Sequence, residues 1–379
     1  MRPEERRAVG TLAFIHGLVH GTILAIPVFL ALAWGPEFRL EPLLAGGLAA
    51  VAYVGFGAAS VPFGRLADRG GTRELLALSV VGIAASLAAV ALSPGLPGLA
   101  VSLGVLGVTA GAYHPTALAY ISRHVQEQGR GMGWHGMGGS LGVALEPAIV
   151  GALLALGVPW RAVVAGMTIP PILAFLLLAL QRTASAPQSR TASSLRHDLR
   201  SVATPAFVPV AFVYAFAGIA YWGSLTFLPG IVGTASYALL LALGAAGQVL
   251  SGHLADRPRP HRTLFRMTFA AAAVLTVLAT EIPWLVAAGA WTFGFLLFSL
   301  EPLQNTLVTQ TVPREVRGLA FGITFLSVFG VGSLGAVVAG AMLGRGEQGP
   351  LFLLLAGSLG LSGGAALLSE KRRRSRGPG

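Results

Sequence analysis

Long apolar segments, each about the length needed to cross a lipid bilayer, follow one another from one end of this chain to the other. A membrane-spanning helix needs roughly 20 mostly apolar residues. Only 11% of the residues are charged, well below the roughly 25% of a soluble domain. The sequence therefore predicts an all-α polytopic membrane protein with twelve transmembrane helices, at residues 8–34, 42–63, 74–92, 97–121, 131–157, 161–181, 205–230, 233–251, 263–280, 284–308, 318–343 and 350–369.

The arginines indicate which ends of these segments share a side of the membrane. The chain carries 26 Lys and Arg against 15 Asp and Glu, a net charge of +11. Nearly all of the basic residues lie in alternate loops, whereas the opposite loops hold only Arg39, Arg161 and Arg345. Because basic loops stay on the cytoplasmic side, both termini are expected in the cytoplasm and the chain in a cell inner membrane. Topology thus accounts for the positive charge, and no nucleic-acid partner is expected.

A polar stretch divides the twelve segments six and six. It is RTASAPQSRTASSLRHDLRSVAT, at residues 182–204. We therefore expect an N-terminal six-helix bundle at 1–181, a cytoplasmic linker at 182–204, and a C-terminal six-helix bundle with a basic cytoplasmic tail at 205–379. The apolar run that follows the basic start of the chain is too long for a signal-peptide core, so it is expected to form the first span.

The two halves carry related motifs at a nearly constant spacing. GRLADR at 64–69 recurs as GHLADR at 252–257, 188 residues later. Two further pairs are each 187 residues apart: His114-Pro115 with Glu301-Pro302, and Arg130-Gly131 with Arg317-Gly318. Repeated six-span halves are typical of transporters whose substrate site lies between the two bundles.

The first copy of this motif resembles a known family signature. GRLADRGGTR is similar to the loop between the second and third spans of the Major Facilitator Superfamily, with matches at Gly64, Leu66, Asp68, Arg69, Gly71 and Arg73. It departs from the signature at Thr72, where the family has a basic residue. The resemblance covers essentially the whole chain. It implies two pseudo-symmetric six-helix bundles and a secondary active transporter that works by alternating access.

The resemblance also implies a conformational latch. In the superfamily, the loop aspartate and its arginine neighbours hold the two halves together on the cytoplasmic face and release them as the protein changes state. A carboxylate beside a helix N-terminus is worth about 0.3–2 kcal/mol, which is enough to bias a nearly balanced equilibrium. The latch residues implied are Gly64, Asp68, Arg69 and Arg73 in the first copy, and Asp256 and Arg257 in the second.

A finer resemblance concerns the fourth and fifth spans. YHP at 113–115 and the following GRGMGWHGMGGSLG are similar to the fosmidomycin-resistance-like and related drug efflux branches of the superfamily. Those branches often carry His and Asp four residues apart in the first span, where this chain has His16 and His20. The resemblance therefore implies export.

Ionisable side chains inside spans mark candidate functional sites, because each one is costly in lipid unless it is paired or hydrated. His16 and His20 are one helical turn apart and are expected to share a face. Glu146 precedes Pro147, whose missing amide proton is expected to open the helix locally. The candidate substrate- and proton-binding residues are His16, His20, His114, His135, Glu146 and Glu301, with Tyr113 and Asn305 as uncharged members.

Two chemistries suit this set of residues. Histidine changes charge near neutral pH, and a carboxylate in an apolar setting can also bind a proton there, so the set can carry coupling protons. Histidines and carboxylates also ligate divalent transition metals. Proton or substrate handling is favoured, because two histidines four residues apart predict a metal site only weakly, and metal ligation stays open as the alternative. No cofactor is expected.

The sequence thus favours proton-coupled export of a small neutral or cationic organic molecule by a monomer in the lipid bilayer. Because no Lys or Arg lies in the interior of a predicted span, a strongly anionic substrate such as a phosphonate or sugar phosphate is disfavoured. Divalent-metal export and proton-coupled nutrient uptake are the alternatives. GGSLG at 138–142 matches a hydrolase nucleophile pattern, but no strand precedes it, so an intramembrane enzyme is a distant alternative.

Overall fold

Every regular element in the described part of the chain is helical. The structure is a computed structural model that describes residues 1–181, 194–255 and 259–375. The predicted latch residues Asp256 and Arg257 and most of the predicted linker lie outside these ranges. Helices dominate because a helix satisfies its own backbone hydrogen bonds, which lipid cannot do for it.

The N-terminal half contains six spans, some of them built from two or three consecutive helical pieces. Pro3–Phe38, Leu96–Ile121 and Trp160–Leu180 are such composite spans. The elements are α1 (Pro3–Phe29), the π-helical turn η1 (Leu30–Trp34), α2 (Gly35–Phe38), α3 (Pro42–Arg69), α4 (Thr72–Ala91), α5 (Leu96–Gly111), α6 (Tyr113–His124), α7 (Gln128–Ala155), α8 (Trp160–Gly166) and α9 (Ile169–Leu180).

The C-terminal half repeats this organisation after a short surface helix, α10 (Leu195–Val202). Its tenth and eleventh spans are joined by a 3-10 turn, η2, and the eleventh contains a second π-helical turn, η3. The elements are α11 (Phe207–Leu225), α12 (Leu228–Val232), α13 (Thr234–Ala255), α14 (Pro260–Leu278), α15 (Pro283–Thr311), η2 (Arg314–Val316), α16 (Arg317–Phe325), η3 (Leu326–Val331), α17 (Leu334–Leu343) and α18 (Gln348–Arg374).

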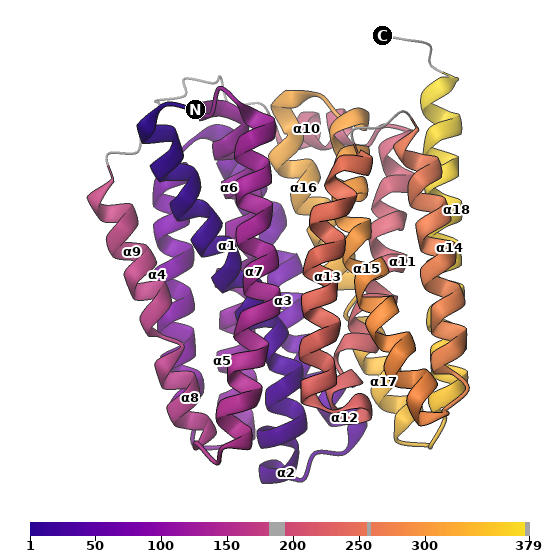
Figure 1. Cartoon of the computed structure of the whole chain (residues 1–379). Coiled ribbons are helices and arrows are strands. Elements are labelled where there is room, and N and C mark those ends of the chain that lie inside the picture. The colour runs from indigo at the N-terminus through magenta and orange to yellow at the C-terminus, as the bar shows by residue number, and fades with distance from the viewer. Residues whose placement is uncertain (182–193, 256–258, 376–379) are drawn as a thin grey trace.

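Eleven of the described helical segments are long and apolar enough to cross a membrane. The remaining predicted span, 263–280, corresponds to α14, which carries Arg262 and Arg266 in its first two turns and packs between α15 and α18 (Figure 1). Several helices extend past the predicted apolar core: α1 starts at Pro3 and α3 continues to Arg69. They do so because a helix continues through the interfacial layer that flanks the hydrocarbon.

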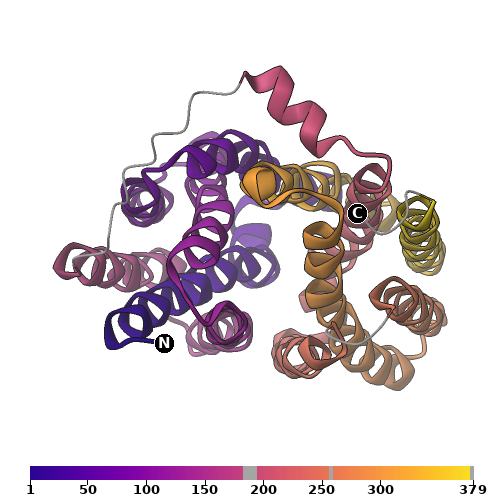
Figure 2. The same ribbon diagram turned by 90° about the horizontal axis from the view of Figure 1, so that it is seen from above.

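The two sets of helices meet along two seams. Seen from one end in Figure 2, α1–α9 gather on one side and α11–α18 on the other. One seam joins α3 to α16, η3 and α17, and the other joins α7 to α13. Small residues allow close approach at the first seam: a Cβ on Gly57 would lie 2.5 Å from the Gly330 nitrogen, and one on Gly64 would overlap the Gly318 carbonyl. Glycines at such crossings let helix backbones touch.

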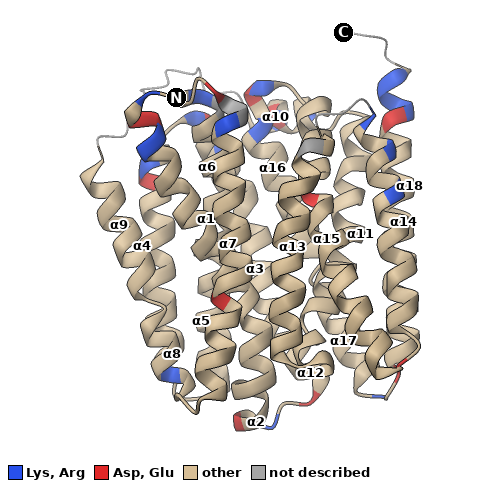
Figure 3. Ribbon diagram, in the orientation of Figure 1, with Lys and Arg blue, Asp and Glu red and all other residues tan. Residues whose placement is uncertain are grey.

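The N-terminus and the last turns of α18 lie on the same side of the molecule (Figure 1). In Figure 3 most Lys and Arg ribbon segments are also at that end. The middle of the bundle is almost free of coloured segments in Figure 3. This distribution is the one that the positive-inside rule requires for cytoplasmic termini, which stays a prediction.

Single cysteines should test this orientation, because the chain has no cysteine of its own. Ser375→Cys, at the arginine-rich end, is expected to react with an impermeant maleimide only from the cytoplasmic side of sealed vesicles. Leu92→Cys, in a loop at the other end and 82% exposed, should react only from outside. Labelling of both positions from the same side would contradict the topology.

Candidate functional site

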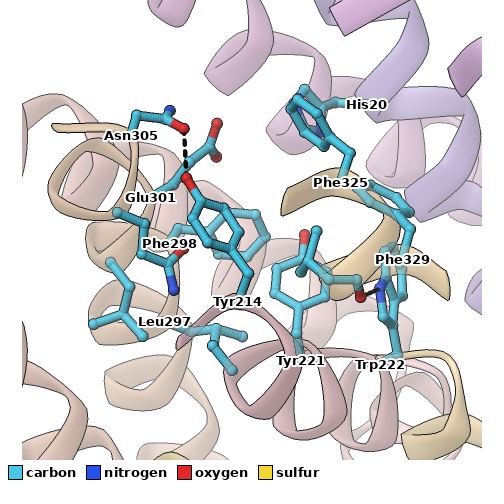
Figure 4. Close-up of a pocket in the computed structure, with 14 residues that line it drawn as sticks. His20, Tyr214, Tyr221, Trp222, Leu297, Phe298, Glu301, Asn305, Phe325 and Phe329 are labelled. Atoms are coloured by element: carbon cyan, nitrogen blue, oxygen red, sulfur yellow. Dashed lines mark hydrogen bonds between the residues drawn. The ribbon is translucent and has the colours of Figure 1, made fainter. Parts of the chain in front are cut away.

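A pocket with an empty volume of about 610 Å³ lies between the two halves. His20 of α1 is its contribution from the N-terminal half, and all its other lining residues come from α11, α15, α16 and η3. None of the described residues that line it is Lys or Arg. The lining residues are His20, Tyr214, Ala217, Tyr221, Trp222, Leu297, Phe298, Leu300, Glu301, Gln304, Asn305, Phe325, Val328 and Phe329 (Figure 4).

One wall of the pocket is polar and lies on α15. The Tyr214 hydroxyl donates to Asn305 Oδ1 at 2.8 Å (Figure 4). Glu301 Oε2 accepts a 2.7 Å hydrogen bond from Gln248 Nε2 on α13. The Gln248 Oε1 accepts in turn from the Ser140 hydroxyl on α7, at 2.8 Å. The side-chain amide of Gln248 therefore links the Glu301 carboxylate to Ser140, at the seam between α7 and α13.

The rest of the pocket is apolar and largely aromatic, and two of its rings stack on rings from α3. Phe329 stacks on Phe56 with a centroid distance of 3.8 Å, and Trp222 stacks on Tyr53 at 3.8 Å. The indole N–H of Trp222 donates to the Val328 carbonyl at 2.9 Å. These contacts hold the aromatic rings in place, and the indole N–H already has its acceptor. Such surfaces suit a flat apolar ligand.

Four histidines and a tyrosine form a buried cluster in the N-terminal half. The Nε2 atom of His114 lies 3.0 Å from Nε2 of His16 and 3.1 Å from Nε2 of His20. His16 Nδ1 lies 2.8 Å from the His135 carbonyl oxygen. His135 Nε2 lies 3.1 Å from the Tyr113 hydroxyl, which donates to the Leu12 carbonyl. Apart from Glu146, all the candidate residues predicted in this half therefore lie together. His20 belongs both to this cluster and to the lining of the pocket.

Close packing of α1 on α7 creates this cluster. A Cβ on Gly17 would lie 2.8 Å from the Gly138 carbonyl oxygen, and one on Gly142 would overlap the Gly17 backbone. With the two backbones in contact, the imidazoles of His16 and His135 stack at 3.9 Å. A larger side chain at either glycine would push α1 and α7 apart and so separate the two rings.

Glu146 lies apart from both the pocket and the histidines. Its Oε1 accepts a 3.0 Å hydrogen bond from the Thr22 hydroxyl of α1, and its side chain covers Gly21. α7 runs as one α-helix from Gln128 to Ala155, so Pro147 lies inside a continuous helix. The predicted local opening is therefore limited, since the helix continues beyond the one hydrogen bond that proline cannot donate. The carboxylate instead ties α7 to α1.

Gln248 and Ser140 are not among the residues predicted from the sequence. Both are buried, at 8% and 4% exposure, but neither is ionisable, so neither stands out as an intramembrane charge. A glutamine in the apolar run 233–251 is a signal that could have been used, because an uncharged amide also needs a hydrogen-bonding partner in lipid. The aromatic residues Phe325 and Phe329 carried no such signal, since phenylalanine is common in any span.

The predicted latch aspartate spans the two halves. Asp68, at the end of α3, accepts from the backbone N–H groups of Gly318 at 3.1 Å and Leu319 at 2.9 Å. These are the first free amides of α16, where a helix N-terminus attracts an anion. Arg123 of α6 also donates to Asp68, at 3.0 Å.

The other predicted latch residues have different contacts. Gly64 packs directly on Gly318, across the same seam. Arg73 donates to the Leu178 and Ala179 carbonyls at the end of α9, at 3.5 and 3.3 Å, within its own half. Arg69 ends α3. Of the described latch candidates, Asp68 and Gly64 therefore touch the opposite half directly.

A comparison with known protein families decides the identity of this fold. The family model described as Major Facilitator Superfamily matches residues 11–337. The chain belongs to this superfamily. Superfamily membership makes it a multi-pass membrane transporter rather than an enzyme, and the predicted architecture of twelve helices in two bundles is confirmed.

Relatives in the superfamily include transporters of organic acids. The chain is 26% identical to the "Gentisate transporter" of Corynebacterium glutamicum, over 93% of this chain and 82% of that protein. It is 24% identical to the "Gallate transporter" of Pseudomonas putida, over 96% and 92% of the two chains. A solved bacterial homologue of the human lysosomal transporter Spinster, inward-facing and unoccupied, superposes with a TM-score of 0.68 at 17% identity, covering 99% and 98% of the two chains.

Proposed function

We propose that this transporter exports a small organic molecule with an apolar, ring-sized body, neutral or cationic, in exchange for protons. The pocket between the halves is the observation that carries the proposal. It is walled by aromatic rings, holds the carboxylate of Glu301, and has no Lys or Arg among its described lining residues. A site between two bundles can be exposed to either side of the membrane in turn, which is the requirement of alternating access.

The shape and lining of the pocket support an apolar ring as the body of the cargo. Tyr221, Phe298 and Phe325 offer faces and edges for stacking, and aromatic faces also attract cations. Asn305 and Gln304 offer hydrogen bonds to a substituent.

Glu301 supports exchange with protons. A carboxylate in an apolar pocket needs a partner, either a bound proton or a cation. If cargo and proton satisfy Glu301 in turn, the release of one requires the binding of the other, which couples their movements in opposite directions. The titratable groups that share the pocket with Glu301 are His20, Tyr214 and Tyr221, and Gln248 donates to it from the seam.

Transport into proteoliposomes tests this proposal. An acidic interior should drive accumulation of benzyltrimethylammonium, an aromatic cation whose permanent charge prevents passive trapping by the pH gradient. Accumulation should disappear when the gradient is collapsed and in vesicles that lack the protein. Proton-dependent movement of benzoate without movement of the cation would contradict export of a neutral or cationic cargo, and flux of neither would contradict the assignment of the pocket.

A second candidate function is uptake of an aromatic hydroxy acid together with protons. The names of two relatives, a gentisate and a gallate transporter, favour it, and the aromatic walls of the pocket suit such a ring as well. The benzoate arm, repeated with an acidic exterior and with protein-free vesicles as the control, tests it, with gentisate and gallate as further substrates. The negative charge of an acid would need a positive partner. Among the described side chains that line the pocket, only His20 can become a cation, by binding a proton.

A further inference from the structure

Three imidazole nitrogens meet at one point beside the pocket. They are Nε2 of His16, His20 and His114, and one nitrogen from each ring lies within 4.8 Å of the others. The ring centroids are 4.6, 4.8 and 4.9 Å apart, so the three rings are nearly equidistant from one another. The two shortest Nε2–Nε2 distances are 3.0 and 3.1 Å. A tetrahedral zinc ion, with Zn–N bonds of about 2.0–2.1 Å, holds its ligand nitrogens about 3.3 Å apart.

Hydrogen bonding among neutral rings does not satisfy this arrangement. His16 donates its Nδ1–H to the His135 carbonyl, which leaves a lone pair on its Nε2, because a neutral imidazole carries one proton. If His114 Nε2 carries a proton, it can donate that proton to His16 Nε2. It then has neither a second proton nor a lone pair for the contact with His20 Nε2. A cation at the centre would instead accept all three Nε2 lone pairs.

We propose that His16, His20 and His114 form a binding site for one divalent transition-metal ion. Neutral imidazole suits zinc, cobalt, nickel and copper, whereas calcium and magnesium prefer oxygen ligands. The His16–His135 hydrogen bond is the outer contact that fixes a ligating ring and its tautomer in metal sites. Three histidines leave a fourth position open, as in zinc sites that bind water or substrate.

The fourth coordination position of the ion would affect which cargo the pocket binds. His20 is both a ligand and a lining residue of the pocket (Figure 4), so the ion lies at the pocket edge. Three neutral ligands leave the charge of a divalent ion uncompensated, which favours an anionic oxygen, such as hydroxide or a carboxylate, as the fourth ligand. The ion would thus supply the positive charge that the pocket side chains lack. This consequence rests on the second candidate function, transport of an acid, whereas the metal site itself rests on neither candidate.

Cobalt binding to the purified full-length chain tests the site directly. The protein, carrying no polyhistidine tag and stripped with a chelator, is titrated with CoCl₂ in detergent. We expect the strong visible absorption of four-coordinate cobalt, saturating at one ion per chain and removed by added ZnCl₂. His20→Ala and His114→Ala should each weaken binding by at least about tenfold, since even outer contacts of a metal site are worth 10–100-fold.

The matched controls are His124→Ala and His261→Ala, which remove histidines of α6 and α14 that lie outside the cluster and should leave the titration unchanged. His114→Gln replaces His114→Ala if the alanine variant is not monodisperse. Absence of the band in the unmodified chain, or a band unaffected by loss of His20 or His114, would overturn the metal site. Because no gradient or cargo is present, that result would leave the transport assignment untouched.

Discussion

Glu301→Gln is expected to abolish accumulation of cargo against a gradient while preserving most cargo binding. Glutamine has nearly the same size and can still hydrogen-bond to Gln248, but it cannot bind or release a proton. Affinity for a neutral cargo should fall by no more than about tenfold, the equivalent of about 1.4 kcal/mol, because the aromatic walls and Asn305 remain. Proteoliposome accumulation under a pH gradient and ligand-induced thermal stabilisation measure the two effects separately.

Glu146→Gln is the comparison for this prediction. Both residues are intramembrane glutamates that precede a proline, but Glu301 lines the pocket and Glu146 contacts Thr22 between α1 and α7. The sequence gives both the same predicted role in proton binding. If accumulation fails in Glu146→Gln and survives in Glu301→Gln, the coupling proton binds between α1 and α7, and the pocket carboxylate has another function.

Asp68→Asn should reduce transport by about tenfold or more with little change in the amount of folded protein. Asparagine keeps one acceptor oxygen but removes the negative charge that faces the α16 N-terminus and Arg123, a contact worth up to about 2 kcal/mol. Loss of that charge shifts the equilibrium between facing states away from the one with Asp68 bound to α16. The measurement is flux per folded transporter, together with spin-label distances across the α3–α16 seam.

Glu127→Gln is the control for the latch. Glu127 also pairs with an arginine at the arginine-rich end of the bundle, Arg130 at 3.3 Å, and both side chains are exposed. We expect its removal to leave transport nearly intact, since exposed ion pairs contribute about 0–1 kcal/mol. Equal losses in the two variants, or no change in seam distance with Asp68→Asn, would contradict a latch at Asp68.

The sequence alone determined the number of spans, their division into two sets of six, and the side on which the arginines gather. These properties depend on composition over windows of about 20 residues, and lipid enforces them locally because unpaired backbone and charge are costly at every point of a span. The motif at 64–69 also singled out Asp68 as a latch candidate, through its resemblance to a family signature. The spans and the charge distribution follow from short segments considered one at a time.

Only the tertiary structure decided which polar side chains share a site. His16, His114 and His135 come from three separate spans, and their rings meet because glycines let α1 lie directly on α7. Glu301 is joined to Gln248 and Ser140 across two helices, whereas Glu146, its counterpart in the sequence inventory, faces Thr22. Rotation of each helix about its axis sets these meetings, and that rotation is fixed by packing between helices, where one missing Cβ changes the distance between two backbones.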